Sequence, residues 1–189
     1  MEPPRRLPRR PWIAAAVALI IVLGGAVGGW WWRAHRWDFA PEVARLVEQG
    51  DRLEWRGDTR RNLNNAEQTY RQALSLAPGN PLIEAQLAAL LGRINAQFPE
   101  QGQRQEIRQL TGRALERAPE HPMPWVARAK LLLLENKPRE AEVAARKAIE
   151  RDPDFDRGYT LLGEALVTQG RLEEGLAECA RDTVVVSNP

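Results

Sequence analysis

The sequence contains one cysteine and two histidines. A single cysteine excludes an intrachain disulfide and any zinc site built on several thiolates. His35 and His121 lie far apart in the chain, and neither has an obvious nucleophile partner. The HExxH and GxSxG motifs, the P-loop and the dinucleotide-binding fingerprint are also absent. These absences leave no catalytic constellation, so we expect a protein that is not an enzyme and needs no metal or cofactor.

Charge is distributed unevenly along the 189 residues. Residues 1–37 carry six arginines and one acid, a net charge of +5, and because the whole chain carries +2, residues 38–189 carry −3. The folded part is thus mildly acidic, which argues against nucleic acid as a partner although the sequence pI is about 9.0. Arginine outnumbers lysine and alanine is abundant, a composition typical of bacteria with GC-rich genomes.

An apolar segment near the N-terminus predicts a membrane anchor. Residues 11–32 contain no charge, and a helix over 12–32 would rise about 31 Å, close to the ~30 Å thickness of a hydrocarbon core. A cleaved signal peptide is the alternative, because Ala26 and Gly28 have the spacing of a cleavage site before Gly29. The length of the segment and the bulky tryptophans after it favour a retained anchor. Its predicted interface residues are Trp12, Trp30, Trp31, Trp32 and Arg33.

The charges that flank the anchor predict its orientation. Four arginines precede it, whereas only Arg33 and Arg36 follow closely, with Asp38 and Glu42 behind them. Positive charge favours the cytoplasmic side of a membrane. We therefore expect a single-pass protein of the bacterial inner membrane, with a cytoplasmic N-terminus and a periplasmic C-terminal domain.

Glycines form two overlapping GxxxG pairs near the end of the anchor, Gly24 with Gly28 and Gly25 with Gly29. Glycines four residues apart let two helix backbones approach closely. These pairs either contact a partner transmembrane helix or reflect a simple enrichment of glycine in the anchor.

Helical segments that end at a proline recur beyond Phe39. Pro78, Pro119 and Pro153 each follow an amphipathic stretch, and the last two are 34 residues apart. A period of 34 residues is typical of solenoids built from helix–turn–helix units. No such unit can bury its apolar face alone, so each unit depends on its neighbours.

The segment between Pro122 and Pro153 resembles a tetratricopeptide repeat (TPR). TPR sequences have a large residue at repeat position 4, small residues at 8, 20 and 27, and proline at 32; here these are Trp125, Ala129, Ala141, Ala148 and Pro153. The resemblance implies an all-α chain, in which a single N-terminal transmembrane helix is followed by an α-solenoid of about four TPR-like repeats.

The predicted organisation follows from this pattern. It comprises a cytoplasmic basic tail at 1–11, a transmembrane helix at 12–32, a linker at 33–42 and a solenoid at 43–189, with repeats at about 43–80, 81–121, 122–155 and 156–189. The first repeat needs about four extra residues, placed in 57–65, and the second about seven, placed in 95–104 between its two helices. Cys179 falls on a packing position of the fourth repeat, where we expect a buried thiol.

In the TPR family the first helices of the repeats line a concave groove that holds a peptide or a partner helix. The resemblance assigns this groove to Val47, Asp51, Trp55, Ala85, Ala89, Arg93, Met123, Val126, Lys130, Leu133, Arg157, Thr160, Glu164 and Val167. Val47 and Asp51 replace the Lys-and-Asn clamp with which chaperone-binding members hold a C-terminal carboxylate, so we expect an amphipathic helix as the ligand. Alternatively, Val47, Ala85 and Val126 only pack between repeats.

The chain ends just as the fourth repeat closes, with the sequence RDTVVVSNP. Solenoids need a polar outer face on their terminal repeat. Val184 to Val186 either pack back on Leu161, Leu166 and Leu172, or fray, or form a docking surface for another chain.

Two functions fit these predictions. The first is a non-catalytic membrane-anchored scaffold or adaptor that binds a protein partner and supports assembly of an envelope complex. The second is narrower, because the layout resembles the TPR subunits of bacterial cytochrome c maturation, in which an extracytoplasmic solenoid presents apocytochrome to the haem ligation machinery. That resemblance assigns the role to the groove residues and implies no haem ligand in this chain.

Overall fold

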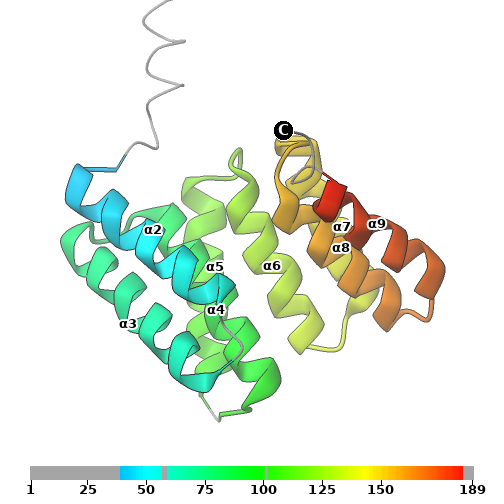
Figure 1. Ribbon diagram of the computed structural model, residues 1–189, viewed down its shortest axis with the longest axis horizontal. Coiled ribbons are helices and arrows are strands. Elements are labelled where there is room, and N and C mark those ends of the chain that lie inside the picture. The colour runs from blue at the N-terminus through cyan, green and yellow to red at the C-terminus, as the bar shows by residue number, and fades with distance from the viewer. Residues whose placement is uncertain (1–38, 57–58, 101, 185–189) are drawn as a thin grey trace, which may run out of the picture. The chain divides into compact units, whose positions relative to one another are not determined.

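The computed structural model describes residues 39–56, 59–100 and 102–184, with side chains through Ala180. Eight α-helices and no strands make up these residues, which confirms the predicted all-α class for this part of the chain. The helices, shown in Figure 1, are α2 (Pro41–Trp55), α3 (Arg60–Leu76), α4 (Pro81–Gln97), α5 (Gln103–Arg117), α6 (Pro122–Leu134), α7 (Pro138–Arg151), α8 (Asp156–Thr168) and α9 (Leu172–Val184).

All of the described helices belong to one compact unit that begins at Ala40. The predicted anchor at 12–32, with its interface tryptophans and paired glycines, lies outside the described residues. Among the residues that are described, no helix is both long enough and apolar enough to cross a membrane.

Proline marks the start of four helices. Because proline has a fixed φ and no backbone N–H, it suits the first turn of a helix, where that N–H would have no partner within the helix. The prolines concerned are Pro41, Pro81, Pro122 and Pro138. They place the starts of α4 and α6 at the repeat boundaries expected from the sequence.

Side-chain caps complete three helix starts. Asn80 Oδ1 accepts hydrogen bonds from the backbone N–H groups of Leu82 and Ile83, at 3.0 and 3.3 Å. Thr59 caps α3 through its Oγ1, and His121 caps α6 by accepting the Met123 N–H at its Nδ1, 3.1 Å away. These bonds satisfy N–H groups that a helix end otherwise leaves unpaired.

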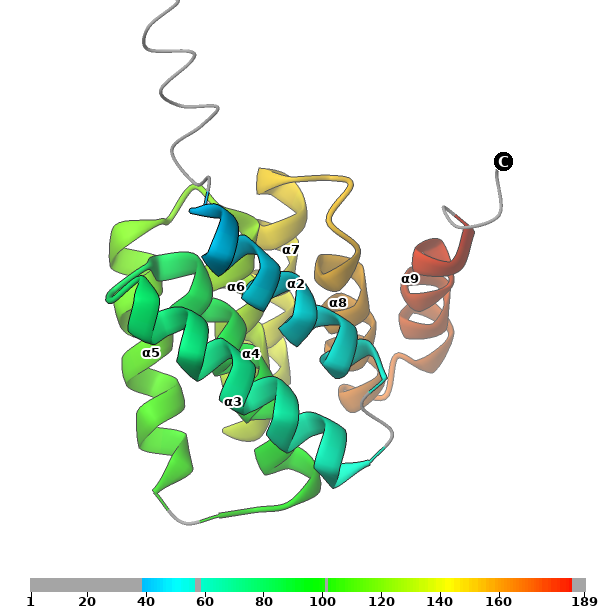
Figure 2. The ribbon, with the colours of Figure 1, turned by 60° about the vertical axis from the view of Figure 1, so that its left-hand side comes forward.

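The helices pair in sequence order, α2 with α3, α4 with α5, α6 with α7 and α8 with α9, and successive pairs stack on one another (Figure 2). Small residues stand where helices approach most closely. The fully buried alanines Ala66, Ala73, Ala114, Ala141 and Ala148 occupy the second helices of three repeats. This pattern is that of a TPR-like solenoid.

Helix α4 lies at the centre of the fold. Twelve of its seventeen residues are buried, and its neighbours include α3, α5 and α6. Its one buried carboxylate, Glu84, accepts a hydrogen bond from Arg113 Nε of α5 at 2.8 Å. A helix that is buried on nearly every side holds the elements around it in fixed positions.

The two segments of the predicted insertions differ in structure. In the first repeat, residues 60–65 belong to α3, which begins at Arg60 and runs for 17 residues. In the second repeat the turn from Phe98 to Gly102 follows a 17-residue α4. The buried Asn95 closes this turn, since its Nδ2 donates to the Glu100 carbonyl and to Gln103 Oε1, both at 3.2 Å.

The last helix pair is packed tightly. A Cβ atom added to Gly163 of α8 would lie 2.3 Å from Cys179 Sγ of α9. The Cys179 side chain is therefore a half-buried packing group against α8. On the outer side of α9, Leu172 and Leu176 are 56% and 57% exposed. The side chains of Val184 to Val186 lie outside the described residues, so their packing stays a prediction.

Candidate functional site

The first helices α2, α4, α6 and α8 carry the residues assigned to the groove. Five of these residues are apolar and buried, with exposures of 8% or less: Val47, Ala85, Ala89, Met123 and Val126. In an open groove without a ligand these positions would face solvent. The structure therefore does not present them as a free binding surface.

The first and fourth repeats meet on this side of the solenoid. Arg157 Nη2 at the start of α8 donates to Asp51 Oδ1 of α2 at 2.9 Å and to Glu54 Oε2 at 3.2 Å. Arg93 Nη1 of α4 donates to the backbone carbonyl of Glu54 at 2.9 Å. Helix α2 is thus held to both α4 and α8 at its C-terminal end (Figure 2).

Tyr70 of α3 contacts the same two carboxylates, those of Asp51 and Glu54. Its hydroxyl donates to Asp51 Oδ1 at 2.6 Å and lies 3.3 Å from Glu54 Oε2. The Tyr70 ring packs against Gly50, where an added Cβ would lie 2.6 Å from the ring. We call this group of residues the α2 clasp; its members are Asp51, Glu54, Tyr70, Arg93 and Arg157.

The clasp fixes the protonation of its own members. Burial raises the pKa of Tyr70 well above its ordinary value, and the charges of Glu54 and Asp51 raise it further. Burial acts to lower the pKa of Arg157, but the nearby carboxylates of Glu54 and Asp51 outweigh that effect and raise it. Tyr70 is therefore a neutral donor and Arg157 a cation around neutral pH.

A second polar tie links α6 to α8. Lys130 Nζ donates to both carboxylate oxygens of Glu164, each at 2.8 Å. The Lys130 side chain is only 13% exposed, and Gly92 of α4 leaves room for its stem. Lys130 and Glu164 occupy the same repeat position 34 residues apart, so their contact follows the stacking of adjacent repeats.

The remaining groove residues take no part in the clasp. Trp55 is 88% exposed at the end of α2, and Thr160 and Val167 are exposed on α8. Leu133 is half-buried on α6. The sequence reasoning assigned Asp51, Arg93 and Arg157 to the groove but missed Glu54 and Tyr70. Glu54 could have been found, because it lies three residues after Asp51 and so on the same helix face.

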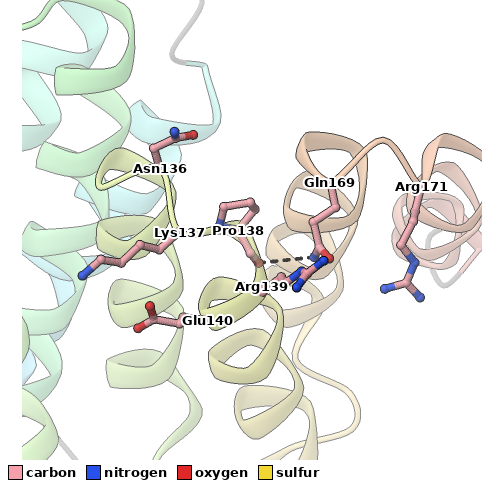
Figure 3. Close-up of a pocket in the computed structure, with 7 residues that line it drawn as sticks. All are labelled: Asn136, Lys137, Pro138, Arg139, Glu140, Gln169 and Arg171. Atoms are coloured by element: carbon pink, nitrogen blue, oxygen red, sulfur yellow. Dashed lines mark hydrogen bonds between the residues drawn. The ribbon is translucent and has the colours of Figure 1, made fainter.

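A shallow pocket of about 480 Å³ lies elsewhere, between the α6–α7 turn and the start of α9 (Figure 3). Its polar groups bind one another or close neighbours. Gln169 Nε2 donates to the Pro138 carbonyl at 3.4 Å and to Glu142 Oε2 at 2.9 Å, and Arg171 Nη1 donates to the same Glu142 oxygen at 3.0 Å. These bonds hold the turns together, and we assign the pocket a structural role.

Metal binding finds no support in the described part of the chain. No three histidine, cysteine or acidic side chains gather there in a way that could hold a metal ion.

Comparison with known proteins places this geometry in a family. The family model described as "Tetratricopeptide repeat" matches residues 59–80, which cover α3 and the corner that leads into α4. The chain therefore contains a tetratricopeptide repeat. No curated protein matches this TPR chain by sequence.

Two solved structures with TM-scores of 0.50 or above share the fold. An O-GlcNAc transferase of Thermobaculum terrenum matches with a TM-score of 0.51 and 19% identity, over 66% of this chain and 22% of the transferase. The TPR domain of Sgt2 from Aspergillus fumigatus matches with a TM-score of 0.50 and 24% identity, over 73% and 83%. MamA of Desulfovibrio magneticus RS-1 has a TM-score of 0.47 and 17% identity, over 81% and 78%.

These matches limit what can be carried over to the TPR chain. It spans only about a fifth of the length of the transferase, so none of that protein's activity is transferred. At such identities the likeness shows the fold alone. TPR solenoids are scaffolds for protein–protein interaction, and their extended concave surface is the part that binds.

Proposed function

We propose that this TPR protein is a non-catalytic, membrane-anchored adaptor of the bacterial inner membrane. It binds a protein partner or a helical peptide on the extracytoplasmic side and supports assembly of an envelope complex. The observation that carries the proposal is the concave side of the solenoid, where small apolar residues lie between charged residues of four different helices. The anchor and its orientation rest on the sequence of residues 1–42.

A helix is the occupant that suits this surface best. The floor residues Ala85, Ala89 and Val126 are small but buried in the free protein, so a helix backbone can approach them closely only after the residues that cover them move. The charged groups Arg93, Lys130 and Arg157 surround them and are already engaged in hydrogen bonds with carboxylate or carbonyl oxygens. Amphipathic helices bind grooves through such an apolar stripe with polar contacts at its edges.

A site-specific photo-cross-linker tests the groove as the binding site. We would place the cross-linking amino acid at Thr160, which is exposed on α8, and in a matched variant at Val143, which is 56% exposed on the second helix α7. In membranes of the native host, the Thr160 position should give a discrete cross-linked adduct and the Val143 position should not. Equal adducts from both positions, or none from Thr160, would contradict the proposal.

The narrower candidate is a TPR accessory subunit of cytochrome c maturation that presents apocytochrome to the haem ligation machinery. The lengthened turn between α4 and α5, closed by Asn95, is the feature that favours it. A helical peptide from the C-terminal end of an apocytochrome should then bind the full-length protein with a Kd of about micromolar order. A deletion strain that keeps its c-type cytochromes, together with no peptide binding, would contradict this candidate.

A further inference from the structure

Helix α2 departs from the stacking of the other first helices. It packs mainly on α3, whereas α4 packs on α6 along much of its length. At its C-terminal end, Asp51 and Glu54 are directed to Arg157, more than a hundred residues further along the chain. The C-terminal end of α2 is therefore bonded to α8, although the body of the helix packs mainly on α3.

The face of α2 that carries the clasp is built like that of an amphipathic ligand. Val43, Val47, Asp51 and Glu54 follow one another at spacings of four, four and three residues, so they share one helix face. The two valines are 5% and 6% exposed. One helix thus supplies both an apolar stripe and a pair of carboxylates one turn apart, and it does so beside the buried floor of the groove.

The groove has the opposite charge. Apart from α2, the assigned groove residues include three cations, Arg93, Lys130 and Arg157, and one acid, Glu164. The guanidinium of Arg157 offers a fork of donors that suits carboxylates, and here it contacts two of them. Once Asp51 and Glu54 are withdrawn, the surface left behind is positively charged.

The ion pairs of the α2 clasp can be replaced by equivalent pairs from another helix. The side chains of Arg157 and Asp51 are 33% and 39% exposed, so water reaches this ion pair, whereas the side chain of Glu54 is 13% exposed. Ion pairs that water reaches contribute little to stability, which makes their replacement by an equivalent pair easy. The packing of Tyr70 against Gly50 keeps α2 on α3 independently of the contact with α8.

We propose that α2 occupies the groove as an internal substitute for the partner, and that the partner is an amphipathic helix with two carboxylates one turn apart that takes over Arg157 from Asp51 and Glu54. This inference rests on the proposed function and names the chemistry of its partner. It also implies that the groove of the free protein is closed to weak ligands. A tethered competitor acts at an effective concentration of about millimolar order, so only a better-matched helix displaces it.

Two labelled peptides test the proposal on the full-length protein in detergent micelles. The first copies residues 40–56, and the second carries Asn and Gln in place of its two clasp acids. The binding of each peptide is measured by fluorescence anisotropy against the wild type, the double variant Asp51→Asn/Glu54→Gln, Arg157→Ala and Arg171→Ala. Arg171→Ala is the matched control, because Arg171 also binds two carboxylates, Glu142 and Glu174, at a site away from α2.

The expected affinities distinguish two effects, the opening of the groove and the recognition of acidic side chains by Arg157. The acidic peptide should bind the double variant about tenfold more tightly than it binds the wild type, because the internal competitor is weakened while Arg157 is kept. The affinity of the amide peptide should increase much less between the wild type and the double variant. Arg157→Ala should bind both peptides alike, and Arg171→Ala should behave as the wild type. Circular dichroism confirms that each variant is folded. The double variant removes the two acids of the clasp, whereas Arg157→Ala removes the cation that they bind.

Two results would overturn the inference. Equal binding of both peptides to the double variant would refute recognition of paired carboxylates, although the groove would still bind helices. No gain in any variant would show that α2 does not block the groove. Neither result decides the proposed function, because the cross-linking comparison of Thr160 with Val143 tests separately whether the groove has a partner.

Discussion

Tyr70 links two helices with one side chain. Its ring is fully buried between α2 and α3, and its hydroxyl binds Asp51 of the clasp. TPR sequences place a large residue at this position to fill the space between helices. In this chain the same residue also positions a carboxylate for Arg157, so a packing residue supports the contact between distant repeats.

Replacing Tyr70 by phenylalanine removes the hydroxyl and keeps the ring. We expect the free energy of unfolding to fall by about 1 to 2 kcal/mol, because a hydrogen bond to a charged acceptor is lost and nothing replaces it. Urea unfolding followed by circular dichroism measures the change. An unchanged midpoint would show that the hydroxyl does not stabilise the clasp.

His121 makes stability depend on pH. Burial lowers the pKa of His121 below its ordinary value of 6.5, an effect that Asp152 partly opposes. The neutral ring also caps α6 through Nδ1. The unfolded chain therefore takes up a proton near pH 6.5 that the folded chain takes up only at lower pH, so this contribution to stability is present above pH 6.5 and is lost as the pH falls.

The variant His121→Asn isolates this effect, because asparagine caps a helix without titrating near neutral pH. The stability of the wild type relative to His121→Asn should fall as the pH drops from about 7.5 to 5.5. Denaturant unfolding at a series of pH values measures the difference. A difference that stays constant over this range would contradict the assigned role of the buried neutral ring.

At the scale of elements, close helix packing depends on particular glycines. Gly163 lies against Cys179 and the Gly175 carbonyl in the α8–α9 pair, whereas Gly112 of α5 has nothing within 4 Å of an added Cβ. Gly163→Ala should therefore cost about 1 to 3 kcal/mol through overpacking. Gly112→Ala should add about 0.5 to 1 kcal/mol through helix propensity. Thermal unfolding compares the two, and a shift of both variants in the same direction would contradict this packing.

The helix pairs could be predicted from the sequence because their signals are local. Pro81 and Pro122 mark helix starts, and the 34-residue spacing of Pro119 and Pro153 gives the repeat length. The pattern placed about four extra residues in 57–65 but did not show where the next helix begins; Thr59 caps a helix that begins at Arg60. Whether one capping residue starts a helix within a polar segment depends on packing, which the sequence pattern does not show.

The candidate site was predictable only in its parts. Asp51 and Arg157 were both assigned to the groove, on repeats at opposite ends of the solenoid. Their contact depends on the tilt of α2 and on the curvature added over three repeats. No sequence motif within either repeat predicts that geometry. The burial of Val47 and Val126 likewise follows from the arrangement of whole helices and not from their local sequence.

At the scale of the whole molecule, the proposed adaptor combines an anchor with a solenoid. The anchor prediction states that residues 12–32 stay in the mature chain and that the solenoid lies outside the cytoplasm. N-terminal sequencing of the protein from membranes should therefore find the original N-terminus. Proteinase K added to spheroplasts should digest a C-terminal tag. A mature chain that begins at Gly29, or a protected tag, would contradict the anchor or its orientation.

The central structural claim is that the clasp holds the first repeat against the fourth. Its most direct test is a distance measurement by electron–electron double resonance between spin labels at the exposed positions Gln49→Cys on α2 and Thr160→Cys on α8, in a Cys179→Ala background. We predict one narrow, short distance distribution that lengthens and broadens when Arg157 is replaced by alanine and stays unchanged in the Arg171→Ala control. A broad, long distribution in the presence of Arg157, or one indifferent to its loss, would contradict a groove closed by α2.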